Sequence, residues 1–162
     1  MEEQLHELYK QYTEDATQEE KNILLTILQG LNKRKSNKQG SYIGGLLNME
    51  KTLNKEICEI TIPISPMLNN SLDIVHGGIT ATLIDSAMGT LANHVLPEEY
   101  GAVTTQLNIH YLSVGKGDYL TCKARIDHKG TKTMVMSADV YRCDGKKVAQ
   151  ASGSFFIIGK KV

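Results

Sequence analysis

The stretch NSLDIVHGGITATLID, Asn70–Asp85, decides how the rest of the chain is interpreted. An amide, a histidine, two glycines and a carboxylate interrupt an otherwise mainly apolar run. We expect Gly77 and Gly78 to lie where an extended segment becomes a helix. The first N–H groups of a helix have no partner within it, so they can bind a developing negative charge. The stretch therefore predicts an active site.

The expected helix carries a carboxylate two turns after its start. Asp85 lies in a window whose apolar residues should pack against a sheet. These are Ile79, Leu83, Ile84, Ala87, Met88 and Leu91. The small residues Ala81 and Gly89 stand one turn before and after Asp85, which leaves room for a ligand or a partner element to approach the carboxylate.

The spacing between the glycines and the carboxylate has a geometric consequence. Gly77 and Asp85 are eight positions apart in the sequence, which amounts to roughly 12 Å along a helix axis. Catalytic groups must come within roughly 3 Å of the atoms on which they act. If both groups act on one substrate, Asp85 must come from a second copy of the chain, so we predict a homodimer with shared sites.

Composition restricts the classes of function. The 162 residues include 18 basic and 18 acidic side chains, so no net field favours nucleic acid or an anionic membrane. We therefore expect neither as a partner. The chain opens with Met-Glu-Glu and contains no long apolar run, which favours a cytoplasmic location. Cys58, Cys122 and Cys143 show no metal-binding spacing and are expected to be free thiols.

The chain divides into a helical extension and linker, residues 1–40, and a main domain, residues 41–162. Helical periodicity over residues 2–31 predicts two helices. Thr17 and Glu20 have capping-box spacing, which places the second helix start near residue 18, and Gly30 is its expected end. The polar, basic segment 32–40 is interpreted as a linker. Its Lys33–Lys35 cluster is a solvated run rather than a nucleic-acid or phosphate contact.

From residue 41 onward, alternating β-branched patterns predict strands. They cover roughly 41–50, 54–64, 102–114, 118–128, 131–143 and 146–158. Glycine-containing turns between the last four strands favour an antiparallel meander. One long helix must then be covered by a sheet of five or six strands. The expected fold class is α+β.

One helix in an antiparallel sheet, together with the pattern Asn-x5-His-Gly-Gly-x6-Asp, resembles the hot-dog-fold acyl-CoA thioesterases of the phenylacetate-pathway (PaaI-type) branch. The resemblance covers residues 41–158. It is supported by the segment VTTQLNIHYL, residues 103–112, by His-Lys-Gly at 128–130 and by DGKKVAQA at 144–151. It implies a hot-dog fold, in which the sheet wraps around the long helix.

The resemblance also implies roles for individual residues. Asp85 would attack the thioester carbonyl as general base or nucleophile, and the Gly77 N–H would polarise that carbonyl. His76 and Asn70 would place the thioester and the attacking water, and Thr104 would orient the water beside Asp85. The family pattern has glycine three residues before the histidine.

This chain instead has Asp73 at the glycine position. A side chain there could alter the conformation of the loop or the entrance for the substrate.

Apart from the resemblance, two of the site residues also have structural interpretations. Asn69–Ser71 would form an ordinary turn, and Asp85 could be a buried carboxylate paired with Arg125.

The implied substrate is an acyl-CoA, and no cofactor is expected because coenzyme A is part of the substrate. Thioester hydrolysis requires no metal, and the five histidines show no metal-ligand spacing. Gly78 and Gly130 would be further substrate contacts. Candidates for binding the CoA phosphates lie near the turn at Gly130, and these are Arg125, Lys129 and Lys132. Exposed basic side chains are common at strand ends, so the alternative is that these residues are ordinary surface charges.

Three classes of function fit this pattern. Hydrolysis of acyl-CoA to a free acid and coenzyme A is favoured. A non-catalytic acyl-CoA-binding or sensing module on the same fold is the alternative, although the carboxylate at position 85 argues against it. A hydratase or dehydratase ranks last. Self-association beyond a dimer, to a tetramer, is expected from the exposed sheet. The spacing does not distinguish one acyl group from another.

Overall fold

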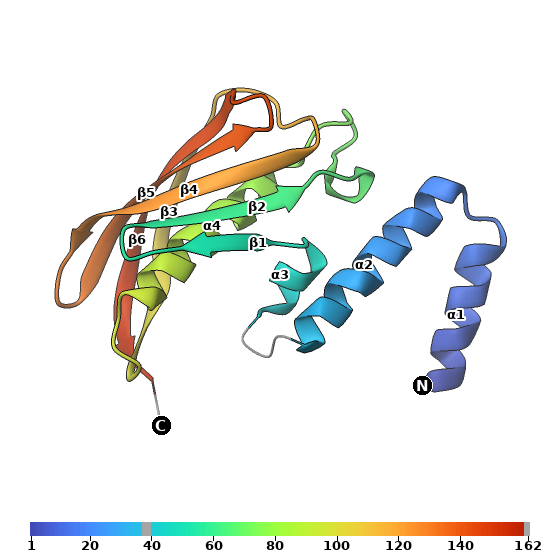
Figure 1. Ribbon diagram of the computed structural model, residues 1–162, viewed down its shortest axis with the longest axis horizontal. Helices are drawn as coiled ribbons and strands as arrows, with labels where there is room; N and C mark the ends of the chain where they lie inside the picture. Colours follow the sequence, from blue (N-terminus) through green and yellow to red (C-terminus); the bar gives the residue numbers. More distant parts are fainter. Residues whose placement is uncertain (37–39, 161–162) are drawn as a thin grey trace. The chain divides into compact units, whose positions relative to one another are not determined.

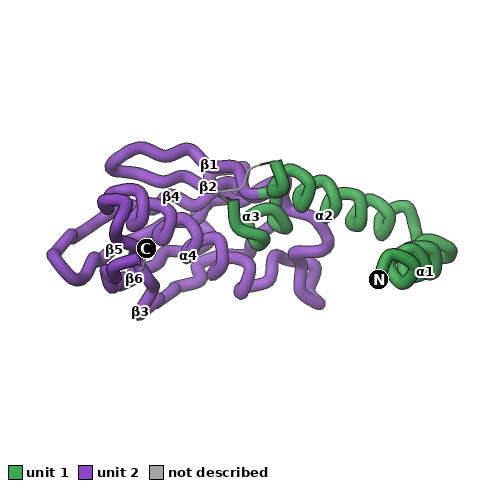
Figure 2. Tube along the Cα trace, turned by 90° about the horizontal axis from the view of Figure 1, so that it is seen from below, with its two compact units in different colours: residues 1–48 green, residues 49–162 purple. Residues whose placement is uncertain are grey.

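The computed structural model describes residues 1–36 and 40–160. Contacts divide the chain into two compact units, Met1–Asn48 and Met49–Val162, which Figure 2 shows in different colours. The second unit contains the Asn70–Asp85 stretch. Each unit is therefore described by itself, beginning with the second.

The second unit is one antiparallel sheet with a long helix against one face (Figure 1). Its neighbouring strands follow the order β1-β2-β4-β5-β6-β3. The strands are β1 Glu50–Leu53, β2 Ile57–Pro63, β3 Tyr100–Tyr111, β4 Tyr119–Lys129, β5 Thr133–Arg142 and β6 Lys147–Gly159, and the helix is α4, Gly77–His94. This arrangement confirms the α+β class, with six strands and one long helix among the residues of this unit that the structure describes.

The core of this unit lies between α4 and the sheet, because α4 contacts every strand from β2 to β6. Five of the six apolar helix residues expected in the core are fully buried, and these are Leu83, Ile84, Ala87, Met88 and Leu91. Ile79 is only half-buried, contrary to expectation, and Thr80 is buried in its place. The predicted face is thus correct from the second turn onward and rotated by one residue in the first turn.

The predicted meander is only partly correct. β4, β5 and β6 are joined in sequence by antiparallel pairing, but β3 pairs with β6. The segment 115–118, expected to be a hairpin turn, instead connects strands that are not neighbours. The glycines signal a change of chain direction, and they carry no information on which strand the chain joins next.

The predicted strand 41–50 is wrong for most of its length. Residues Tyr42–Leu46 form a short helix, α3, and β1 begins only at Glu50. The Ser41 hydroxyl accepts a hydrogen bond from the Gly44 N–H at 3.0 Å, so this serine caps a helix instead of entering a strand. An N-cap serine within an apolar run was the signal for this helix.

The first unit contains the two helices that the periodicity predicts, α1 Glu2–Glu14 and α2 Gln18–Ser36. The capping box at the start of α2 is confirmed. The Thr17 N–H donates to Glu20 Oε2 at 2.7 Å, and the Glu20 N–H donates to Thr17 Oγ1 at 3.3 Å. Hydrogen bonds from the Thr17 backbone and then from its hydroxyl lower the pKa of the Glu20 carboxyl.

Gly30 does not end the second helix, which was the expectation. It is buried inside α2, where a Cβ atom would lie 2.1 Å from the carbonyl oxygen of Gly45. Glycine at this position therefore permits a close approach of α3 rather than a change of direction. The helix continues through Lys33–Lys35, whose charges suit a helix C-terminus. Residues 32–36 are thus helix and not linker, and residues 37–39 of the predicted linker lie outside the described residues.

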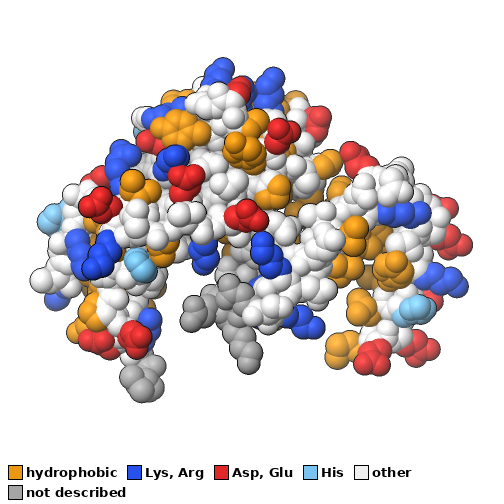
Figure 3. Space-filling view, viewed as in Figure 1, with side chains coloured by type: hydrophobic (Ala, Val, Ile, Leu, Met, Phe, Trp, Pro, Cys, Tyr) orange, Lys and Arg blue, Asp and Glu red, His pale blue; other side chains and the backbone are white. Residues whose placement is uncertain are grey.

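The apolar side of α1 is largely exposed. None of its residues is buried, and Leu5 and Leu8 retain 70% and 66% of their accessible surface. Together with Ile23 and Leu24 of α2, they line a groove of about 640 Å³, and hydrophobic side chains are visible on the surface of this unit in Figure 3. The two helices form as the periodicity predicts, but their apolar sides are not fully buried within the unit.

The three cysteines are free, as predicted. Cys58 and Cys122 are buried, and Cys143 is half-buried. Burial raises the pKa of the Cys58 thiol to about 11 and raises that of Cys122 further. Both thiols are therefore protonated at neutral pH and pack as small apolar side chains.

Substitution Gly30→Ala tests the close approach within the first unit. Alanine is the better helix former by about 1 kcal/mol, so propensity alone predicts a gain in stability. We expect instead a loss of about 2 kcal/mol, because the added methyl group overlaps the Gly45 carbonyl. Urea unfolding followed by far-ultraviolet circular dichroism measures the difference. Gln29→Ala, at the neighbouring exposed position, should change stability by less than about 0.5 kcal/mol; equal effects of the two variants would contradict the packing argument.

Candidate active site

The Asn70–Asp85 stretch begins its helix at His76, which is the N-cap residue of α4. The Nδ1 atom of its ring accepts a hydrogen bond from the Gly78 N–H at 2.9 Å. An imidazole that accepts at Nδ1 carries its proton on Nε2 when neutral. His76 therefore caps the helix with one nitrogen and keeps an N–H donor on the other.

The first turn of α4 leaves one backbone donor unused. The N–H groups of Ile79 and Thr80 donate to the His76 carbonyl at 2.9 and 3.3 Å, and that of Gly78 donates to the His76 ring. Within residues 1–36 and 40–160, the Gly77 N–H has no hydrogen-bond acceptor. The single free donor at this positively polarised helix end is thus the one that the sequence singled out.

Gly77 borders a small cavity. The cavity has a volume of about 320 Å³, and its lining includes Asn70, Gly77, Thr80 and Tyr111. The Tyr111 hydroxyl donates to the Gly77 carbonyl at 2.8 Å, so the end of β3 is tied to the start of α4. The structure therefore brings Gly77 and Asn70 to one cavity, as the sequence predicts.

The side-chain oxygen and nitrogen of Asn70 have different environments. Its side-chain oxygen accepts from the Leu72 N–H at 2.9 Å, which makes the ordinary turn that the sequence also suggested. No acceptor is found for its side-chain nitrogen among the described residues. The turn interpretation and the substrate interpretation are therefore compatible, because they use different atoms of the same amide.

The loop between Asn70 and His76 adopts a left-handed conformation at Asp73, with φ of 55°. Glycine enters this region at no steric cost, and aspartate is one of the few other residues that tolerate it. The Asp73 carboxylate accepts a hydrogen bond from the Asn69 side chain at 2.8 Å. The departure from glycine at this position therefore keeps a backbone conformation that glycine also adopts, and the Asn69 contact holds the added side chain.

Asp85 lies half-buried on α4 and accepts a hydrogen bond from the Thr104 hydroxyl at 2.7 Å. A β-bulge in β3, between Thr104 and Gln106, makes this contact possible. Thr104 pairs with the buried Phe155, whereas Gln106 pairs with Ser154 on the opposite face. In a regular strand, residues two positions apart lie on the same face. If the alternation after the bulge continued backwards, Thr104 would lie with Gln106 on the face that points away from α4.

The structure does not bring Asp85 and Gly77 together within one chain. Both lie in the same continuous helix, so the axial separation of roughly 12 Å holds. Arg125, which could have locked Asp85 in an ion pair, contacts Asp127 and Asp139 on the other side of the sheet. The Asp85 carboxylate therefore has no cationic partner within residues 1–36 and 40–160.

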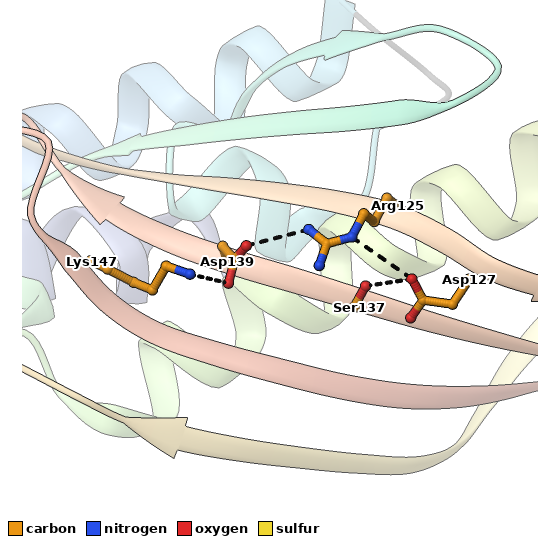
Figure 4. Close-up of polar contacts among 5 residues, drawn as sticks. All are labelled: Arg125, Asp127, Ser137, Asp139 and Lys147. Atoms are coloured by element: carbon orange, nitrogen blue, oxygen red, sulfur yellow. Dashed lines mark hydrogen bonds and ion pairs between the residues drawn. The ribbon is translucent and has the colours of Figure 1, made fainter.

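The expected group of phosphate contacts is not assembled. A second bulge, in β4 between Ile126 and His128, sends Arg125 and Lys129 to opposite faces of the sheet. The Arg125 guanidinium lies on the outer face, as Figure 4 shows, and Lys129 donates to the carbonyl of Val95 at the end of α4. Lys132 and Gly130 lie in the turn that follows. These residues therefore do not form one phosphate site in a single chain.

The outer face of the sheet instead carries a charge network centred on Asp139 (Figure 4). Its carboxylate accepts hydrogen bonds from Lys147 at 2.9 Å and from Arg125 at 3.3 Å. Burial raises the pKa of Asp139, but the hydrogen bonds from Lys147 and Arg125 outweigh that effect and hold its pKa below the ordinary value. Arg125 is thus neutralised by acidic neighbours of its own sheet.

Two other kinds of site are not found in the described part of the chain. No group of three or more histidine, cysteine, aspartate or glutamate side chains there could hold a metal ion. No described helix is long and apolar enough to cross a membrane. The cavity beside Gly77 and the Asp85–Thr104 pair remain the chemically distinctive features.

Comparison with known proteins supports the family assignment. Residues 72–149 match the sequence profile of the thioesterase superfamily. Human acyl-coenzyme A thioesterase 13 is 31% identical over 112 residues, which cover 67% of this chain and 76% of the relative. The mouse protein of the same name is 36% identical over 100 residues, covering 59% of this chain and 68% of that protein.

Solved structures agree with this relationship. A crystal structure of a Bacillus halodurans protein with CoA has a TM-score of 0.88 and 39% identity, and covers 95% of this chain and 99% of that one. The Escherichia coli PaaI protein from the phenylacetic acid degradation operon shares the fold, with a TM-score of 0.71, 22% identity and coverage of 84% and 98%. The chain belongs to the thioesterase superfamily. It has the hot-dog fold and is a hydrolase of that class.

Sequence reasoning named most of the residues that meet at this site but missed four features. Tyr111 was quoted only as part of a strand, and nothing in its spacing indicated a contact with Gly77. The two bulges were also missed, since a bulge depends on pairing with a distant strand. The Asn69–Asp73 contact had a local signal, because asparagine and aspartate four residues apart are typical of a closed turn.

Substitutions at position 73 test whether backbone conformation or charge matters there. We expect Asp73→Gly to unfold at nearly the same urea concentration as the unchanged protein, because the relief of strain at positive φ offsets the loss of the Asn69 contact. Asp73→Ala should cost about 1–2 kcal/mol, since alanine keeps the left-handed strain and loses the Asn69 contact. Leu72→Ala, at an exposed position of the same loop, is the control. A glycine variant less stable than the alanine variant would contradict this account.

Substitution Asp139→Asn tests the outer-face network. Because the pKa of Asp139 is lowered in the folded state, the network stabilises the protein above the ordinary carboxyl pKa of 3.8, and this contribution falls as the pH drops below that value. We expect a loss of about 1–2 kcal/mol at pH 7 that shrinks toward pH 3, with the partial exposure of Arg125 and Lys147 limiting its size. Urea unfolding across this pH range measures it. Asp118→Asn is the control, and a pH-independent loss would argue against the ionic origin.

Proposed function

We propose that this protein hydrolyses acyl-CoA thioesters to a free acid and coenzyme A, with Asp85 and the Gly77 N–H as the reacting groups. One observation supports this proposal more strongly than any other. The start of α4 uses every backbone donor of its first turn except that of Gly77, and this donor lies beside a cavity. A single oriented N–H at a helix N-terminus is suited to polarising a carbonyl oxygen.

The choice of acyl-CoA as substrate is supported by the relatives. The human and mouse relatives are named acyl-coenzyme A thioesterases, and the Bacillus halodurans structure contains CoA. A thioester carbonyl is electrophilic, so an aimed N–H donor and a carboxylate are sufficient for attack by water. The phosphate contacts first expected at Arg125 and Lys129 carry no weight here, because the two side chains lie on opposite faces.

In the proposed reaction, the thioester oxygen receives a hydrogen bond from the Gly77 N–H. Asp85 either takes a proton from the attacking water or attacks the carbonyl carbon itself. When Asp85 acts as base, the C–O bond to water forms, the C–S bond breaks, and the proton taken by Asp85 passes to the departing thiolate. When Asp85 attacks, the C–S bond breaks as an anhydride with Asp85 forms, and water then hydrolyses that anhydride, which releases the free acid, restores the carboxylate and supplies the proton of the thiol. The Thr104 hydroxyl, bound to Asp85 at 2.7 Å, fixes the orientation of the carboxylate. The Asn70 side-chain nitrogen and His76 Nε2–H are donors available to place substrate and water.

The proposal requires two copies of the chain. The axial separation of roughly 12 Å within α4 prevents one helix from presenting both groups to one carbonyl. A two-fold axis that sets two copies of α4 side by side in opposite directions brings Asp85 of one copy toward Gly77 of the other. Each dimer then has two equivalent sites. Pairing of dimers into tetramers remains a prediction for sedimentation analysis.

A complementation experiment tests chemistry and shared sites together. Asp85→Asn removes the carboxylate, and Gly77→Pro removes the N–H. Proline is suited to the first helical position, and His76 at φ −59° and ψ 135° has the conformation preferred before proline. Each variant alone should lose most release of free thiol from an acyl-CoA.

Refolding an equal mixture of the two variants should restore about a quarter of the unchanged activity, because half of the dimers are mixed and each has one intact site. Asp118→Asn serves as a control for loss of a surface carboxylate. Sites made within one chain would stay inactive in the mixture. Full activity of Asp85→Asn, or acyl-CoA binding without thiol release by the unchanged protein, would refute the enzymatic proposal and favour a sensing module.

A further inference from the structure

Tyr111 stands out among the residues to which the proposed chemistry gives no role. It is the last residue of β3 and is about half exposed, at 53%. An exposed tyrosine at a strand end ordinarily directs its hydroxyl to water. Here the hydroxyl turns back to the Gly77 carbonyl at 2.8 Å, and the residue lines the same cavity as Gly77 and Asn70.

The ring of Tyr111 also lies directly against Gly77. A Cβ atom added at Gly77 would meet the Cζ atom of this ring at 3.4 Å and its hydroxyl oxygen at 3.5 Å. These are ordinary contact distances, so the tyrosine fills the space on the side of Gly77 where a side chain would stand. A thioester carbonyl must then approach the Gly77 N–H from another side.

The Gly77–Gly78 peptide needs such support because glycine has the widest backbone freedom of any residue. Its two polar ends are both bound by side chains, the carbonyl by Tyr111 and the N–H by the His76 ring. On the other side of Gly77, the His76–Gly77 peptide is held at its carbonyl, which accepts from the N–H groups of Ile79 and Thr80 at 2.9 and 3.3 Å. Gly77 is therefore fixed between anchored peptides, and the direction of its own N–H is fixed with them.

We propose that Tyr111 is a positioning residue, whose hydroxyl holds the Gly77–Gly78 peptide so that the Gly77 N–H points at the thioester oxygen. This inference rests on the proposed function and assigns to it a residue outside the acid and the oxyanion donor. A donor that strengthens its hydrogen bond as charge develops contributes mainly to the transition state. Misalignment of that donor lowers kcat more than it changes KM.

The test compares Tyr111→Phe, which removes the hydroxyl and keeps the ring, with Tyr100→Phe at the opposite end of β3. We expect Tyr111→Phe to lower kcat for an acyl-CoA about tenfold with KM changed less than about twofold. Tyr100→Phe should leave both constants unchanged. An unchanged kcat, or a change confined to KM, overturns the positioning role.

A spectroscopic readout follows the peptide itself. The sequence contains two Gly–Gly peptides, 44–45 and 77–78. Protein labelled with glycine carrying ¹³C at the carbonyl and ¹⁵N at the amide therefore gives only two carbonyl–nitrogen correlations. Tyr111→Phe should shift the 77–78 signal and leave the 44–45 signal in place. An unshifted 77–78 signal would mean that the hydrogen bond does not hold the peptide, which also overturns the proposal.

The same assays separate this inference from the function on which it rests. If the unchanged protein hydrolyses acyl-CoA and Asp85→Asn does not, the function stands, and the Tyr111→Phe result decides the positioning role alone. If the unchanged protein releases no thiol from any acyl-CoA, the proposed function fails, and the positioning role for that reaction is overturned with it. The two failures therefore give different patterns of activity.

Discussion

The unpaired N–H groups at the start of α4 are the constraint on which the rest of this site depends. A helix end must satisfy its first donors with caps, water or ligand. Here the His76 ring and carbonyl satisfy all but one of the donors in the first turn. The remaining donor belongs to Gly77, beside a cavity. Under the proposed function, the caps fix the helix and the free donor binds the substrate carbonyl, so one local arrangement would supply both stability and chemistry.

The sequence predicts those parts of the molecule that local rules determine. The capping box at Thr17, the start of α4 and the α+β class all follow from spacings of a few residues. The structural predictions failed where contacts with distant segments of the chain determine the conformation or the strand pairing. Gly30 is buried in mid-helix because the Gly45 carbonyl approaches it, and β3 joins β6 instead of β4. A glycine in a sequence does not reveal whether it serves a turn or a close approach.

In the candidate site, too, local sequence predicts some contacts, whereas contacts between distant segments could not be predicted. Asn70, His76 and Gly77 lie within eight residues and meet at one end of a helix, so their proximity was predictable. Thr104 reaches Asp85 through a bulge, and strict alternation along the second half of β3 would have placed it on the opposite face. The bulge in β4 separates Arg125 from Lys129 by the same means. An extra residue reverses every facing assignment beyond it, so alternation in the sequence cannot assign the faces of a strand past a bulge.

The rigidity of α4 has a consequence for how the reaction can be organised. A helix keeps Gly77 and Asp85 at a fixed separation, so neither group can be moved toward the other by a loop or a lid. For the proposed reaction, association of two chains would then bring the carboxylate of one copy to the carbonyl polarised by the other. In such an arrangement the unassociated chain has an aimed donor and no attacking group. Activity would depend on protein concentration wherever the dimer dissociates, because the site and the interface would be the same structure.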